Sequence, residues 1–497
     1  MLACTLQGPV PVNVQEVGRL RPCPRLLWLA LLSLAGACSP ANDEGASVAQ
    51  PPGWDEDIGP VLAEDLNADP NVLEVKIEAR LAEIEILPGV RSQVWSYNGS
   101  VPGPLLRAKR GDRLIVHFTN HLPEATTVHW HGVRVPSTMD GTHAVQDPVE
   151  PGESFTYDFE LPDAGTFWYH PHIDSSAQVG YGLYGPIVVE DPDDPVDVDD
   201  LVLVLSDMSL DDEGQLKPGD DTEWFGDYFG REGSVLLVNG KVRPKLRARA
   251  GLPQRWRVIN AARARFFQMD VPGTDLIRIG GDGGLIERPQ TFDELLLVTS
   301  ERAEVLVSFP GSAAGELEVV AQDPDRFGLG VLEPDQPLFD VEVEAGRAGH
   351  PRVPDVLREF PPLDLAGLPT RQIVLGEQAF DGVPHLAING EVHQESMHHH
   401  ETPHVAYVGD TEVWEVLNDT DYAHPFHLHG FSFEVLEVGG RPWPVRELKD
   451  SVNVPPRETL RFVVTYDDRP GLWMFHCHIL DHAKLGMMAV LEVRPRE

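Results

Sequence analysis

The sequence predicts an all-β protein made of three successive β-sandwiches, and two observations carry this prediction. The first is a pattern of short runs in which apolar and polar residues alternate, such as Val72 to Ile86 and Leu114 to Phe118, separated by glycine and proline. Side chains alternate between the two faces of a strand, so this period indicates strands, and clear amphipathic helices are scarce. The second observation is a weak internal repeat.

Each copy of the repeat contains an Asn-Gly pair, a later glycine, an alternating strand and a closing asparagine. The copies start at Asn98, Asn239 and Asn389, which are 141 and 150 residues apart. Their alternating strands are expected over 113–118, 254–259 and 411–417, and the closing residues are Asn120, Asn260 and Asn418. A period of this length suits one sandwich per copy. We therefore expect domains over 72–192, 200–345 and 368–497, with linkers from Asp191 to Asp200 and from Gly346 to Pro369.

Composition narrows the class of partner. The 497 residues carry a formal charge of −40, which argues against nucleic acid because phosphate binding requires clustered lysine and arginine. An acidic balance fits an exported protein that meets cations or neutral reductants, and it fits simple solubility equally well. No apolar run reaches the roughly 20 residues that a membrane-spanning helix requires.

The N-terminus predicts export. Arg19, Arg21 and Arg25 precede an apolar stretch from Leu26 to Ala37, which has the length of a signal-peptide core. The stretch ends in Leu34-Ala35-Gly36-Ala37-Cys38 and resembles a bacterial lipobox, with Ala35 in place of the more usual leucine. This predicts a lipid anchor on Cys38 and a location in the periplasm or cell envelope, with Ser39 favouring the outer membrane; simple secretion is the alternative. The residues before Arg19 suggest a misassigned start codon, and residues 39–71 are expected to form a flexible acidic linker.

Cysteine usage isolates one thiol. Of the four cysteines, Cys4, Cys23 and Cys38 lie in the signal or at its end, so Cys477 is the one that remains in the folded body. An exported chain with a single body cysteine has no intramolecular disulfide there, and that thiol needs another role.

Ten of the twenty histidines form four short clusters, each with a His-x-His pair. Residues i and i+2 of a strand point to one face, so each pair suits one metal ion or two adjacent ions. Two clusters come from the first expected domain and two from the third, which predicts a shared site at their interface. The clustered histidines are His129, His131, His170, His172, His424, His427, His429, His476, His478 and His482.

The last cluster predicts a blue-copper site. In an extended segment Cys477 points one way, while His476 and His478 point the other and serve metals on the opposite face. His482 and Met487 follow Cys477 at five-residue steps, and His424 can reach the same ion. Two imidazoles, a thiolate and a weak thioether describe an electron-transfer copper, whereas a structural zinc site would use further cysteines.

The other eight histidines suffice for three copper ions with positions left open for dioxygen. Four coppers in total can store the four electrons that reduce dioxygen to water. Two other readings remain: a copper-binding or scaffold protein without activity, and a copper nitrite reductase, whose pattern lacks the paired His-x-His clusters.

From 72 to 497 the sequence resembles the three-domain multicopper oxidases, the laccase and copper-tolerance oxidase group. This resemblance implies cupredoxin-like Greek-key domains and an oxidase that couples one-electron oxidation of a small reductant to reduction of O2. It implies a type 1 copper on His424, Cys477, His482 and Met487, and a type 2 copper on His129 and His427. It implies a type 3 pair held by His131, His170, His172, His429, His476 and His478, and an exposed edge of His482 through which the electron enters.

Three further expectations concern protons, substrate and assembly. Asp140 and Asp481 match positions where relatives carry acidic residues that relay protons, although ordinary turn and surface roles are alternatives. The third repeat carries an insert from Met397 to His404 that is either a secondary metal site or a solvated loop. The Met-rich segments of cuprous oxidases are absent, so phenols are the default reductant, with a metal ion as the alternative. A monomer is expected, because one chain completes the site.

Overall fold

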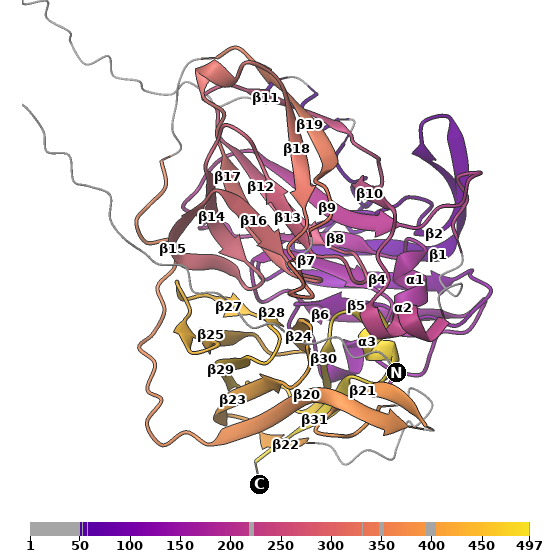
Figure 1. Ribbon diagram of the computed structural model, residues 1–497, viewed down its shortest axis with the longest axis vertical. Coiled ribbons are helices and arrows are strands. Elements are labelled where there is room, and N and C mark those ends of the chain that lie inside the picture. The colour runs from indigo at the N-terminus through magenta and orange to yellow at the C-terminus, as the bar shows by residue number, and fades with distance from the viewer. Residues whose placement is uncertain are drawn as a thin grey trace, which may run out of the picture. The chain divides into compact units, whose positions relative to one another are not determined.

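The computed structural model describes residues 50–496 except 52, 57, 218–222, 331, 347–351, 381 and 394–403, and it leaves out the side chains of 223–225. The protein is nearly all β, with 49% strand and 5% helix, as the alternating pattern predicts. Six sheets form three pairs along the chain (Figure 1). Within the described part of the chain, no helix is long and apolar enough to cross a membrane.

The first pair packs a sheet of order β2-β1-β4-β6 against one of order β3-β8-β7-β5, with a core that includes Leu73, Phe118, Tyr169 and Ile187. Its strands are β1 (Val72–Leu87), β2 (Val90–Tyr97), β3 (Leu106–Lys109), β4 (Arg113–Asn120), β5 (His129–His131), β6 (Ser154–Glu160), β7 (Gly165–His170) and β8 (Gly185–Glu190). Its helical turns are η1 (Ser137–Met139) and α1 (Ser175–Gly180).

The second pair joins a six-stranded sheet, β10-β9-β12-β17-β14-β15, and a five-stranded sheet, β11-β19-β18-β13-β16. Its strands are β9 (Asp200–Met208), β10 (Val235–Val238), β11 (Lys245–Arg249), β12 (Gln254–Asn260), β13 (Phe267–Asp270), β14 (Leu276–Gly281), β15 (Gly284–Phe292), β16 (Glu294–Leu297), β17 (Arg302–Val307), β18 (Gly315–Gln322) and β19 (Gln336–Glu344). The helices are α2 (Glu223–Phe229) and η2 (Gly311–Ala313).

The third pair has sheets of order β21-β20-β23-β29-β25-β26, with β27 beside β25, and β22-β31-β30-β24-β28. Its strands are β20 (Thr370–Phe380), β21 (Val383–Ile388), β22 (His404–Tyr407), β23 (Thr411–Asn418), β24 (His424–Leu428), β25 (Phe433–Val438), β26 (Arg441–Pro442), β27 (Leu448–Lys449), β28 (Ser451–Val454), β29 (Thr459–Thr465), β30 (Gly471–Cys477) and β31 (Met488–Arg494). The helix α3 (Leu480–Lys484) follows β30.

The sequence repeat corresponds to one structural unit in each pair. The first strand of each copy pairs in parallel with the strand that ends at the closing asparagine: β1 with β4, β9 with β12 and β20 with β23. Each Asn-Gly pair has positive φ at both residues, for example 57° at Asn98 and 87° at Gly99. This is the backbone of a type I′ turn, for which Asn-Gly is favoured. The repeat therefore marks a tight turn and the parallel strand pair beside it.

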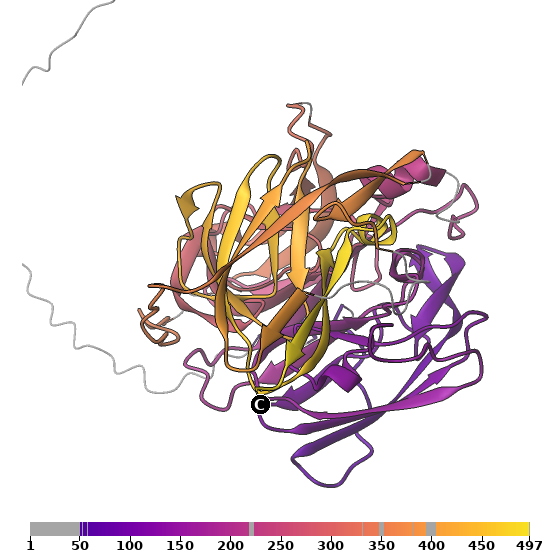
Figure 2. The same ribbon diagram turned by 90° about the horizontal axis from the view of Figure 1, so that it is seen from below.

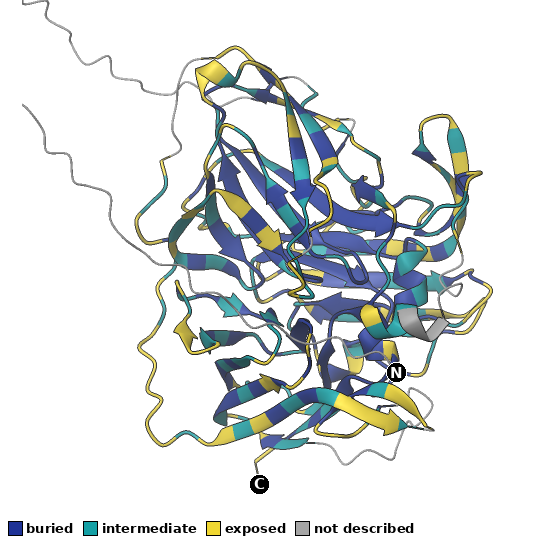
Figure 3. Cartoon of the chain, viewed as in Figure 1, coloured by how far each residue is buried: buried dark blue, intermediate teal, exposed yellow. Residues whose placement is uncertain are grey.

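Buried residues concentrate where sheets face each other (Figure 3). One apolar cluster joins the first and second pairs through residues such as Trp168, Val188 and Val204. Another joins the second and third through Ile279, Leu306 and Val445. The three pairs thus pack on one another within residues 48–497, which form one compact unit.

The expectation of a flexible linker over 39–71 is wrong from residue 50 onward. Ile58 is buried in the core of the second pair, and its carbonyl accepts a hydrogen bond from Asn239 Nδ2. Gln50 Nε2 donates to the Pro253 carbonyl at 2.8 Å. The composition of this segment predicted a flexible linker, because composition does not reveal that Ile58 packs in the apolar core of the second pair. The predicted signal peptide and Cys38 lie outside the described residues.

Candidate metal centres

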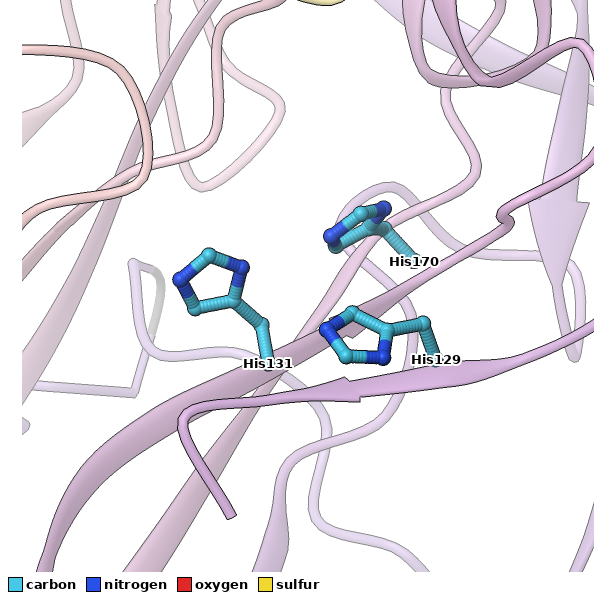
Figure 4. Close-up of side chains that lie close together, drawn as sticks. All are labelled: His129, His131 and His170. Carbon is cyan, nitrogen blue, oxygen red and sulfur yellow. The ribbon is translucent and has the colours of Figure 1, made fainter. Parts of the chain in front are cut away.

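The four histidine clusters meet where the first and third sheet pairs adjoin (Figures 1 and 2). In the first pair His129 of β5 lies opposite His170 of β7, and His131 lies opposite Trp168. In the third pair His427 of β24 lies opposite His476 of β30. Figure 4 shows the rings of His129, His131 and His170 projecting into a shared space. The predicted interface between the first and third domains is therefore where the histidines gather.

Strand alternation sorts the side chains as the sequence predicts. Between His129 and His131, Trp130 turns into the core of the first pair. Between His476 and His478, Cys477 belongs to the core of the third pair. Trp130 and Cys477 thus face their own sandwiches, while the histidines on either side of each face the interface.

Eight imidazoles form one buried group, in which each residue is at most 4% exposed. His131 and His427 stack with ring centroids 3.9 Å apart, and those of His129 and His429 are 4.0 Å apart. His429 Nε2 and His476 Nε2 are 3.1 Å apart. Two nitrogens that bind the same metal ion, each at about 2.0 Å from it, are separated by about this distance. The group comprises His129, His131, His170, His172, His427, His429, His476 and His478.

Several nitrogens of this group have no hydrogen-bond partner among the described residues, although they are buried: His129 Nε2, His131 Nδ1, His170 Nε2, His427 Nε2 and both nitrogens of His478. Buried polar atoms are normally satisfied, so these nitrogens fit metal ligation. His131 differs from its neighbours because its Nε2 lies 3.1 Å from Asp450 Oδ1, so Nδ1 is the nitrogen that would bind a metal ion.

Burial also sets the protonation state. It lowers the pKa of His476 to about 4, with a smaller lowering effect from His129 and with the hydrogen bond to the Cys477 carbonyl acting in the opposite direction. It lowers the pKa values of His131, His170, His172, His427, His429 and His478 well below 6.5. A neutral imidazole is the form that binds a metal, so these side chains are ready to ligate near neutral pH.

A second group lies on the other side of β30. Cys477 Sγ is 3.5 Å from both His424 Nδ1 and His482 Nδ1, and these nitrogens are 3.1 Å apart. Thr420 Oγ1 contacts His424 Nε2 at 2.9 Å and so fixes Nδ1 toward the thiol. One thiolate and two imidazoles in this arrangement suit a blue copper ion.

Met487 is buried in the same core as Cys477. Its amide donates to the His482 carbonyl at 3.0 Å, and its carbonyl accepts from the Cys477 amide at 3.1 Å. These bonds hold the segment after α3 around the thiol. Its thioether as axial ligand stays a prediction.

The prediction that His482 has an exposed edge is wrong, since His482 is 0% exposed. Tyr422 packs against its ring with centroids 5.6 Å apart, and α2 lies against α3, which carries His482. The sequence between the second pair's strands gave no indication that a helix of that pair would cover this ligand.

The two predicted proton-relay carboxylates are placed differently. Asp140 is 1% exposed, and its Oδ2 lies 2.9 Å from His429 Nδ1 while its carbonyl lies 2.8 Å from His129 Nδ1. It therefore touches two predicted copper ligands. Asp481 is 0% exposed and accepts hydrogen bonds from Arg231 Nη1 at 2.7 Å, from the Arg231 amide at 2.6 Å and from Ser176 Oγ. Its relay role stays a prediction.

Sequence reasoning missed Asp450 and the charges around it. Asp450 Oδ1 lies 3.1 Å from His131 Nε2, and its carbonyl lies 2.9 Å from His427 Nδ1. Arg302 of the second pair binds both carboxylate oxygens of Asp450 and is 0% exposed in its side chain. Burial raises the pKa of Asp450, and the Arg302 charge opposes that shift. No motif marks this residue, because its partner comes from a different sandwich 148 positions away.

The insert from Met397 to His404 lies outside the described residues except for His404. His404 begins β22, and its ring centroid lies 5.4 Å from that of Phe475. The choice between a metal site and a solvated loop therefore stays open.

Comparisons with known proteins agree with this geometry. Two profiles described as multicopper oxidase match residues 78–194 and 369–497, the two regions that carry the histidines. The chain is 30% identical to the multicopper oxidase MmcO of Mycobacterium tuberculosis, over 80% of this chain and 82% of that protein. It is 27% identical to a laccase of Bacillus subtilis, over 81% of this chain and 90% of that protein.

A solved structure of a Campylobacter jejuni multicopper oxidase, described as a metallo-oxidase, superposes with a TM-score of 0.79 at 31% identity and covers 88% of this chain and 94% of its own. The cupredoxin fold, the two ligand groups and these relatives lead to one conclusion. The chain belongs to the multicopper oxidases, copper enzymes that use O2 as the electron acceptor.

Proposed function

We propose that this chain is a laccase-like oxidase that binds four copper ions and oxidises a small phenol one electron at a time while reducing O2 to water. The observation that carries the proposal is the pair of separate ligand groups joined through β30. Cys477 belongs to one group, and its neighbours His476 and His478 belong to the other. Copper bound at these groups would supply the redox chemistry.

The protein itself orients the imidazole rings, excludes water from them and transfers protons. Thr420, Asp140 and Asp450 each contact a ring nitrogen and fix which nitrogen faces the metal. Burial of all ten histidines excludes bulk water from both groups. Asp140, which touches two of these imidazoles, is the better-placed carboxylate to pass protons toward reduced oxygen.

The assignment of ions to residues rests on the family resemblance. His424, Cys477, His482 and Met487 would hold type 1 copper, and His129 and His427 type 2. The remaining six histidines would hold the type 3 pair. Phenols are favoured over metal ions as reductants because the methionine clusters of cuprous oxidases are absent. A single chain supplies both ligand groups, which supports a monomer.

The test combines metal content with stoichiometry. Copper-loaded protein should contain four coppers per chain and consume one O2 for every four phenol molecules oxidised, without releasing peroxide. Cys477→Ser should lose the blue absorption and phenol oxidation but keep three coppers. Four bound coppers with no oxygen uptake for phenols, Mn(II), Fe(II) or Cu(I) would contradict the proposal.

We also propose that the protein is exported and anchored by lipid at Cys38, which the sequence of the N-terminus supports. The mature protein should begin at Cys38 with an acyl-modified mass and partition into detergent. Cys38→Ala should move it to the aqueous phase. A soluble mature wild-type protein would favour simple secretion instead.

A further inference from the structure

Two histidines outside the predicted copper ligands meet between the first and third sheet pairs. His143 Nε2 lies 3.1 Å from His393 Nε2, and the two ring centroids are 5.2 Å apart. Both side chains are buried, with 8% of His143 and 6% of His393 exposed. A metal ion at about 2.0 Å from each nitrogen would fit this separation, and so would a hydrogen bond between the two rings. The surroundings of the pair decide between these two roles.

The backbone holds both histidines in place. His143 lies in a turn that is closed by the bond from the Val145 amide to the Thr142 carbonyl at 3.1 Å. The His393 amide donates to the Gly486 carbonyl at 3.0 Å. Gly486 has a φ of 111°, which favours glycine, and this lets the two backbones approach each other. Two fixed backbones therefore set the distance between the two rings.

The residues beside the pair are apolar and include thioethers. Met474 and Met488 belong to a small buried cluster, and this cluster packs against Ala144, the residue after His143. Among the described residues, neither histidine of the pair belongs to a group of three or more His, Cys, Asp or Glu side chains that could hold a metal ion. Zinc in a structural site takes four such ligands, whereas thioethers favour Cu(I) and imidazole also binds copper. These surroundings favour a cuprous ion over a divalent one.

The pair lies beside the eight-histidine group. The ring centroid of His143 is 6.3 Å from that of His172, a predicted type 3 ligand. Ala144 and Val392, which are neighbours of the two histidines in the chain, are partly exposed, whereas each member of the eight-histidine group is at most 4% exposed. The pair therefore lies between that group and the protein surface.

We propose that His143 and His393 form a fifth metal site, which binds one Cu(I) ion and passes it to His172 during copper loading. The ion exchanges its imidazole ligands in this transfer and keeps its oxidation state. The site is additional to the four coppers of the proposed oxidase, and only the transfer rests on that proposed function. An ion that is passed on must be exchangeable, so dialysis against the cuprous chelator bicinchoninate should empty the site and leave the four other coppers.

Binding is tested with Ag(I), which has the charge and closed shell of Cu(I) but does not react with O2. The parent for this test carries alanine at His398, His399 and His400, so that these histidines of the insert bind no silver. Copper-loaded, dialysed protein is titrated with Ag(I), and the bound silver is counted per chain. In crystals of the parent, anomalous scattering should place one silver ion between the rings of His143 and His393.

Two variants separate ligation from hydrogen bonding. His143→Gln keeps a side chain that can donate to His393 but offers a poor ligand for Ag(I), so it should bind one silver ion fewer per chain than the parent. His143→Met supplies a thioether instead, so it should bind as many silver ions as the parent. The matched control is His117→Gln, which removes an imidazole that is 41% exposed on β4 and should leave the silver count unchanged.

Equal silver binding in the parent and in His143→Gln would overturn the site and leave the pair with a hydrogen bond alone. If His143→Gln loses its blue band through misfolding, the silver position in the parent decides instead. A silver ion that lies away from both rings would then overturn the site.

Transfer is tested by adding Cu(I) to metal-free protein without O2 and by quenching samples with bicinchoninate at successive times. Chelator-resistant copper should accumulate severalfold more slowly in His143→Gln than in the parent and should reach the same final content. Equal rates would overturn the transfer. Failure of the oxidase function would show differently, as protein that reaches full copper content yet takes up no oxygen, in the parent and the variant alike.

Discussion

Asp450 shows how one residue can orient ligands from two sandwiches. Its carboxylate contacts His131 from the first pair, and its own carbonyl contacts His427 from the third. Arg302 from the second pair neutralises it. The second pair supplies none of the predicted copper ligands, and its contribution to this centre is the Arg302 side chain, whose ion pair holds the Asp450 carboxyl group in place.

We predict that Asp450→Asn lowers copper affinity at the eight-histidine group by about 10- to 100-fold, as for other residues that orient metal ligands. The blue band should persist, because Asp450 touches none of His424, Cys477 and His482. Copper titration with separate readout of the blue band and of the type 2 and type 3 signals measures this.

Loss of a buried charge partner could also destabilise the fold, and a control separates the two effects. Asp194→Asn breaks the 2.6 Å pair between Asp194 and the nearly buried Arg255, which touches no imidazole. If both variants lose copper equally, Asp450 has only a structural role.

At the scale of the residue, the sequence predicts which histidines gather, but it does not predict the residues that surround them. All ten predicted histidines and Cys477 gather in two buried groups, because His-x-His spacing and strand alternation are local properties; their roles as copper ligands stay predictions. His482's burial, Asp450 and Arg302 depend on contacts between sandwiches, which one sequence does not encode in any local pattern.

At the scale of the element, the three closing asparagines make the same pattern of hydrogen bonds to the backbone. Asn260 is 0% exposed; its Oδ1 accepts from the Ala262 amide, and its Nδ2 donates to the carbonyls of Arg265 and Leu297. Asn120 and Asn418 make corresponding bonds. The asparagine satisfies the backbone where the chain leaves the strand, which explains why the repeat retains it.

We predict that Asn260→Ala destabilises the protein by about 1–3 kcal/mol or more, since buried carbonyls and an amide lose their partner. The urea midpoint followed by tryptophan fluorescence should fall. Asn71→Ala, at an exposed asparagine, should leave it unchanged. An unchanged midpoint in Asn260→Ala would mean that water replaces the side chain at no cost.

The strand positions of the repeat were predictable, whereas the covering helix was not. Strands β4, β12 and β23 start at the predicted residues 113, 254 and 411. α2 is a seven-residue helix without a long periodic pattern, and its position over α3 comes from Arg231 and Arg326. Short elements held by long-range ion pairs leave little trace in the sequence pattern.

At the scale of the whole molecule, the buried histidines make the stability of the metal-free protein depend on pH. Nine of the ten clustered histidines have pKa values lowered by burial, including His424 to about 3 and His476 to about 4. In the unfolded chain histidine titrates near 6.5. Below that pH the unfolded chain therefore binds more protons than the folded metal-free protein.

We predict that metal-free protein is most stable above pH 6.5 and loses stability as the pH falls below it toward the folded pKa values. Each histidine that stays neutral in the folded state adds up to about 1.4 kcal/mol per pH unit to this loss. Urea unfolding at pH 7.5 and 5.5 should show a much lower midpoint at 5.5, and a pH-stat should record proton uptake on unfolding at 5.5. Copper at saturating concentration should raise both midpoints, because the ion binds the folded state and its neutral imidazoles. Equal midpoints at the two pH values without metal, together with no proton uptake, would mean that the imidazoles become charged inside the folded protein.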